Sequence, residues 1–105
     1  MITIIYLWVL ELSFRLPTQL KELKPILSRD YSVKQIGLFG SYASDTANDD
    51  SDIDLIIELD KPIGWKFFSL EIYLEQIFGR KIDLVTKSAL RERMKEDILS
   101  KVNYV

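Results

Sequence analysis

A chain of 105 residues, 48% of them hydrophobic and 29% charged, has the size and composition of one globular domain. Its net charge of −2 argues against an extended nucleic-acid surface, because such surfaces are basic. The sequence has no cysteine and no histidine, which excludes disulfides, zinc–thiolate sites and imidazole bases, so a catalytic metal would need oxygen ligands of the kind that Mg²⁺ prefers.

The first 14 residues form an almost entirely apolar run that contains Glu11 and is followed by Arg15. A transmembrane helix needs about 20 apolar residues, and a signal peptide needs a basic start and a small-residue cleavage site. We therefore expect no membrane partner and take the cytoplasm as the default location. Residues 1–16 are interpreted as an extension that packs on the domain or on a partner, or that is peripheral to function. Residues 17–105 are interpreted as a single domain.

The rest of the chain predicts alternating helices and strands. Strands are expected over Val33–Phe39, Ile53–Leu59 and Lys81–Val85, and helices from Pro17 to about Leu27, from Trp65 to Phe78 and from Thr86 or Ser88 to about Val102. Pro17 suits a first helical turn, whereas Pro25 weakens the last turn. Residues 61–64 have turn composition, and Gly79 suits the residue that ends a helix. This order predicts an α/β (α+β) domain with a small central sheet.

Three carboxylates are the candidate catalytic residues. Asp52 and Asp54 are two positions apart at the start of a strand, so their side chains lie on one face and repel each other unless a cation lies between them. Asp83 interrupts an apolar strand. If this strand lies beside the strand of Asp54, the three carboxylates can converge. Three carboxylates can hold two Mg²⁺ ions for a phosphoryl-type displacement. The alternatives are a solvated Asp-x-Asp turn and an Asp83 that caps a helix or is partly exposed.

Gly40 and Ser41 follow the first strand, about a dozen residues before the carboxylate pair. Glycine lets a phosphate approach the backbone closely, and the serine hydroxyl and the next N–H groups can donate hydrogen bonds to it. Gly-Ser is also a common turn dipeptide. A phosphate cradle followed by a metal-binding pair nevertheless suits one ligand, a nucleoside triphosphate with its metal.

These residues resemble a known family. The segment GSYASDTANDDSDIDL, residues 40–55, is similar to the signature of the minimal nucleotidyltransferases of the polymerase-β-like superfamily. The matching positions are Gly40, Ser41, Ala43, Ser51, Asp52, Asp54 and Leu55. The segment FGRKIDLV, residues 78–85, looks like the family's second block, which places Asp83 in an apolar strand.

The resemblance implies a small mixed sheet flanked by helices, with Asp52, Asp54 and Asp83 as metal-binding and catalytic residues. It implies that Gly40, Ser41 and Ser51 bind the nucleotide. The implied reaction is transfer of a nucleoside monophosphate, usually AMP from ATP, to a hydroxyl group, with two Mg²⁺ ions and with Asp83 as the base. Members of this size are often antitoxins that attach AMP to a tyrosine of a helical HEPN-type toxin, a ribonuclease.

One departure separates this chain from the family pattern. Where the family commonly has Arg-Gly, this chain has Ser44-Asp45, which replaces a cation by an anion beside a triphosphate. An alternative function is therefore an inactive module that neutralises a toxin by binding it. A second alternative is a nucleotidyltransferase for a small molecule or RNA. Apolar residues near the N-terminus, with Trp65 and Phe68, form either a surface for a homo- or hetero-oligomer or part of the domain's own core.

Overall fold

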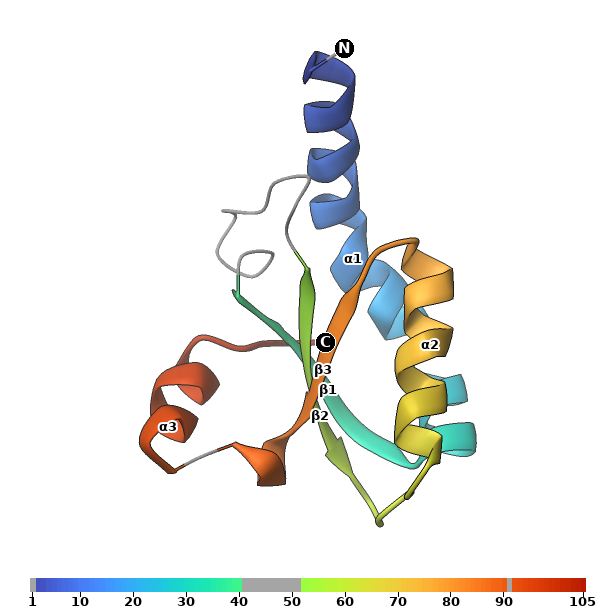
Figure 1. Ribbon diagram of the computed structural model, residues 1–105, viewed down its shortest axis with the longest axis vertical. Coiled ribbons are helices and arrows are strands. Elements are labelled where there is room, and N and C mark those ends of the chain that lie inside the picture. Colours follow the sequence, from blue (N-terminus) through green and yellow to red (C-terminus); the bar gives the residue numbers. More distant parts are fainter. Residues whose placement is uncertain (1, 41–51, 91) are drawn as a thin grey trace.

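The computed structural model describes residues 2–40, 52–90 and 92–105, with side chains placed within 15–40, 52–90 and 95–105. The elements in chain order are α1 (Ile2–Tyr31), β1 (Val33–Phe39), β2 (Ile53–Leu59), α2 (Lys66–Phe78), β3 (Ile82–Thr86), the 3₁₀ helix η2 (Lys87–Ala89), α3 (Glu92–Ser100) and β4 (Asn103–Tyr104). Figure 1 shows α1 and α2 on one side of the sheet and α3 on the other. The expected mixed sheet flanked by helices is confirmed.

The sheet has the strand order β3-β2-β1-β4. β1 pairs with β2 and with β4 in antiparallel orientation, whereas β2 pairs with β3 in parallel orientation. The bounds predicted for β1 and β2 are confirmed, and β3 begins and ends one residue later than expected. Strand β2 is thereby placed inside the sheet, with a hydrogen-bonded neighbour on each side.

Alternation along β2 divides its side chains between two environments. Ile53, Leu55 and Ile57 are buried in the main core, together with side chains from α1 and α2. The helical contributions to this core include Leu16, Leu20 and Leu27 from α1 and Leu70, Leu74 and Phe78 from α2. Burying each such side chain contributes about 1.5 to 3 kcal/mol. The side chain of Asp54 consequently points to the opposite face of the sheet.

Helix α1 differs from the prediction. It begins at Ile2 and includes Pro17 and Pro25, so the expectation that Pro17 lies in the first turn is wrong. A proline inside a helix costs about 3 kcal/mol, but Leu16 and Leu20 next to Pro17 are fully buried against the sheet and offset that cost. The boundary drawn at residue 17 lies within this helix and stays a prediction. Within the described residues, no helix is both long and apolar enough to cross a membrane.

Helix α2 ends as predicted. Gly79 has a φ of 64°, and its N–H donates to the main-chain oxygen of Glu75 at 2.8 Å. Several large apolar side chains of α2 and of the residue before it are exposed: Trp65 is 86% exposed, and Phe68 and Ile72 are each 55% exposed. The interpretation of Trp65 and Phe68 as part of the domain's own core is therefore wrong.

The C-terminal segment also differs from the prediction of one helix that continues to Val102. The chain forms η2 and the shorter helix α3, and then adds β4 to the edge of β1. Val102 packs against Gly37 so closely that a Cβ on that glycine would overlap it. The missing side chain of Gly37 thus leaves room for a segment that covers β1, and this long-range contact ends the helix early.

Candidate active site

The candidate site lies at the start of β2 and β3, on the face of the sheet opposite α1 and α2. Asp54 is half-buried and is paired with Phe39 of β1 on one side and with Asp83 of β3 on the other. Because β2 and β3 are parallel and in register at this pair, both carboxylates project from the same face of neighbouring strands, whose backbones are about 4.8 Å apart. Asp54 and Asp83, two of the three carboxylates predicted to converge, therefore lie side by side.

The electrostatics of this pair are unfavourable without a cation. The pKa of Asp54 is raised to about 6. The largest cause is partial burial, and the nearby carboxylates of Asp83 and Asp52 and a hydrogen bond to Asp83 contribute in the same direction. Ionising the Asp54 carboxylate is therefore costly in the protein as it stands. A carboxylate with a raised pKa at the start of two neighbouring strands is typical of a functional site.

Asp52 is held differently. It precedes β2 and is exposed, and its Oδ2 lies 4.0 Å from Nζ of Lys81. The backbone here is fixed, because the N–H of Ile53 donates to the main-chain oxygen of Lys81 at 3.0 Å. Among the described residues, no group of three or more acidic side chains is close enough together to hold a metal ion. The structure thus brings two of the three predicted carboxylates together, with the third close enough to act on Asp54 through its charge.

Gly40 has a role that its sequence context did not reveal. It follows β1 with a φ of 72°, and a Cβ built on it would overlap the carboxylate of Asp54. A residue with a side chain here would be strained and would also displace that carboxylate. Ser41 and Ser51, predicted to bind the nucleotide, and the Ser44-Asp45 departure lie outside the described residues.

Glu75 of α2 is a further residue that the sequence analysis missed. Its Oε1 accepts a hydrogen bond from the N–H of Ile82 at 3.2 Å, at the residue before Asp83. The bond joins α2 to the first residue of β3 and so helps to fix the position of Asp83. Its only sequence signal is a glutamate on a helix, which by itself favours no particular contact.

Comparison with known proteins identifies the family. The family model described as nucleotidyltransferase domain matches residues 20–105. The chain belongs to the nucleotidyltransferase domain family. As a nucleotidyltransferase it is similar to the protein adenylyltransferase MntA of Thermococcus cleftensis, which is 40% identical over 83 residues that make up 78% of this chain and 84% of the relative.

Two solved structures resemble the fold of this nucleotidyltransferase. A chain in the crystal structure of a toxin–antitoxin with AMP-PNP has a TM-score of 0.66 at 22% identity and covers 80% of this chain and 70% of its own. A chain in the structure of a tri-AMPylated Shewanella oneidensis HEPN toxin in complex with MNT antitoxin has a TM-score of 0.57 at 24% identity, with coverage of 82% and 69%. At these identities the likeness concerns the fold alone.

Proposed function

We propose that this nucleotidyltransferase transfers AMP from ATP to a hydroxyl group of a HEPN-type toxin, most simply a tyrosine, and acts as its antitoxin. The observation that carries the proposal is the Asp54–Asp83 pair, in register on neighbouring strands, in a chain 40% identical to a protein adenylyltransferase. The crystal structures of similar folds with AMP-PNP and with an AMPylated HEPN toxin support the choice of nucleotide and acceptor. We also propose a cytoplasmic location, where ATP is available for this reaction.

The donor set fits Mg²⁺. Asp54 and Asp83 offer carboxylate oxygens, which hard cations prefer, and the raised pKa of Asp54 indicates a position where positive charge is missing. Asp52 is the third proposed ligand. Its contact with Lys81 is exposed and long, so exchanging that partner for a metal costs less than about 1 kcal/mol. When bound, Mg²⁺ offsets the charge of the triphosphate and of the leaving pyrophosphate.

The proposed reaction is a single displacement at the α-phosphorus of ATP. The acceptor oxygen forms a bond to that phosphorus, and the bond from the phosphorus to the oxygen that bridges to the β-phosphate breaks. Pyrophosphate leaves with the electron pair. Asp83, which is exposed and next to Asp54, accepts the hydroxyl proton in this proposal, since the sequence has no histidine to do so. Gly40, Ser41 and Ser51 are proposed to bind the triphosphate.

The direct test uses the full chain, ATP labelled at the α-phosphate, Mg²⁺ and the co-expressed HEPN-type partner. We expect the label to appear on the partner, and Asp54→Asn and Asp83→Asn each to slow transfer by about 100-fold or more. Glu22→Gln is the matched control, because Glu22 is an exposed carboxylate of α1 on the other side of the sheet, and it should transfer normally. Folded wild-type protein that transfers no label, or unchanged transfer by Asp83→Asn, would contradict the proposal.

A second experiment separates catalysis from neutralisation by binding. Cells that express the toxin are supplied with the wild-type chain or with a variant that carries both Asp52→Asn and Asp54→Asn. Loss of protection in the variant, with the complex still formed in a pull-down, supports modification as the antitoxin mechanism. Full protection by the variant would show that binding is sufficient.

A further inference from the structure

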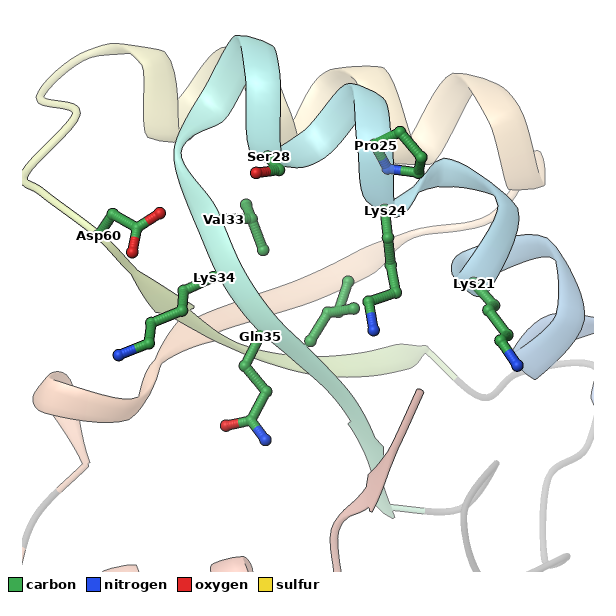
Figure 2. Close-up of a pocket in the computed structure, with 9 residues that line it drawn as sticks. Lys21, Lys24, Pro25, Ser28, Val33, Lys34, Gln35 and Asp60 are labelled. Atoms are coloured by element: carbon green, nitrogen blue, oxygen red, sulfur yellow. The ribbon is translucent and has the colours of Figure 1, made fainter.

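A cavity of about 510 Å³ lies between α1 and β1. Lys21 and Lys24 of α1 and Lys34 of β1 contribute three ammonium groups to its lining, and Asp60 contributes its one carboxylate. Figure 2 shows Lys21 and Lys24 extending from α1 in the same direction, with Lys34 projecting from β1. The cavity thus combines a surplus of positive charge with the edge of a strand, in a protein whose net charge is −2.

The edge of β1 is covered only in part. β4 pairs with β1 at Gly37 and Leu38, and the N–H of Val105 donates to the main-chain oxygen of Ile36 at 3.1 Å. From Gln35 back to Val33, no other described strand lies along this edge of the sheet. An edge of this kind is a ready site for pairing with another extended segment.

Two of the three lysines around the cavity are available for such a segment. Nζ of Lys24 donates to the main-chain oxygen of Val105 at 2.8 Å, so the segment that follows β4 is already held here by one lysine. Lys21 and Lys34 are exposed, and neither forms an ion pair with any side chain that the structure describes. Two ammonium groups therefore remain for acidic side chains next to the strand edge.

We propose that this cavity binds an extended acidic peptide segment of a partner protein, which adds a short strand to β1 between Gln35 and Val33 and places its carboxylates near Lys21 and Lys34. Val33 and Ile36 line the cavity but are buried in the core, so the strand edge and the lysines would carry the binding. A polyphosphate backbone fits less well, because it would leave the strand edge unpaired and would lie near Asp60. The inference goes beyond the transferase reaction and does not depend on it.

The test measures fluorescence anisotropy with a labelled peptide of alternating glutamate and valine, about six residues long, the usual length of a strand. We expect the double variant Lys21→Gln, Lys34→Gln to weaken binding by about tenfold, since each exposed ion pair contributes a few-fold in affinity. Lys61→Gln with Lys95→Gln, which removes equal charge elsewhere on the surface, should leave binding unchanged. Asp60→Asn should tighten it, because a repulsive carboxylate is removed from the lining.

Two further probes examine the pairing itself. A peptide with proline in place of each valine keeps the carboxylates but loses alternate N–H groups, so it should bind more weakly. Amide hydrogen exchange should slow between Val33 and Ile36 when the glutamate–valine peptide is present. The proposal is overturned if the wild-type chain does not bind that peptide, if the proline peptide binds equally well, or if a single-stranded oligothymidylate binds through the same lysines more tightly than the peptide.

Discussion

Replacing Asp54 by asparagine should make the metal-free protein more stable while destroying the proposed site. The pKa of Asp54 is raised from 3.8 to about 6 in the folded protein. The folded state therefore binds more protons than the unfolded state between about pH 4 and pH 6, and stability falls as the pH rises through this range and then stays level. A pKa rise of this size corresponds to a loss of about 3 kcal/mol in the free energy of unfolding. Solvent around the half-buried side chain of Asp54 reduces this loss to about 1 to 2 kcal/mol.

Asparagine does not ionise, and its amide can donate a hydrogen bond to Asp83. Urea unfolding without divalent metal should therefore show Asp54→Asn to be more stable than wild type by about 1 to 2 kcal/mol near pH 8, with the difference nearly gone near pH 4. Added Mg²⁺ should raise the stability of wild type and not that of the variant. Asp60→Asn, at an exposed carboxylate, is the control for stability. Equal or lower stability of Asp54→Asn near pH 8, with Asp60→Asn unchanged, would refute the electrostatic reasoning.

Three further predictions concern packing, and two of them include a control substitution. Gly40→Ala should lower the free energy of unfolding by about 2 kcal/mol or more and reduce transferase activity. Gly79→Ala, at a similar positive φ but in open space, should lower it by about 1 kcal/mol and leave activity unchanged. Equal effects in urea unfolding would argue against the overlap with the Asp54 carboxylate. Glu75→Ala should lower the free energy of unfolding by about 1 to 2 kcal/mol, because the hydrogen bond from the N–H of Ile82 is lost. Glu75→Gln keeps an acceptor oxygen, so thermal unfolding should show less than half of that loss. Leu74→Ala should cost about 2 to 5 kcal/mol, because Leu74 is fully buried, and a smaller loss would mean that the core relaxes around the cavity.

The sequence predicted those parts of the fold that depend on local patterns. The strands β1 and β2 have compact β-branched or apolar runs, and α2 has a broad apolar face followed by Gly79. The pairing of Asp54 with Asp83 was predicted conditionally, because it requires β3 to lie beside β2, and strand order is a long-range property. Once that order is known, a periodicity of two in both strands is sufficient to place the carboxylates on one face.

The wrong predictions concern elements whose limits are set by distant contacts. Pro17 is a common first-turn residue, but α1 passes through it because its leucines are buried on the sheet. The C-terminal helix ends early because Val102 and β4 fill the space beside Gly37. Tertiary structure likewise determines two contacts near the site. A side chain at Gly40 would clash with Asp54, and Glu75 contacts β3. No local pattern in the sequence encodes these contacts.

The in-register parallel pairing of β2 and β3 has one more consequence. The side chains of β3 alternate between the two faces of the sheet, so a slip of one residue along β2 would turn Asp83 toward α1 and α2 and expose Ile82 and Leu84, which are now buried. Such a chain would bury a charge and lose two apolar core contacts in a single step. A misaligned but stable and inactive form is therefore strongly disfavoured, and any molecule that completes its core has also assembled its carboxylate pair.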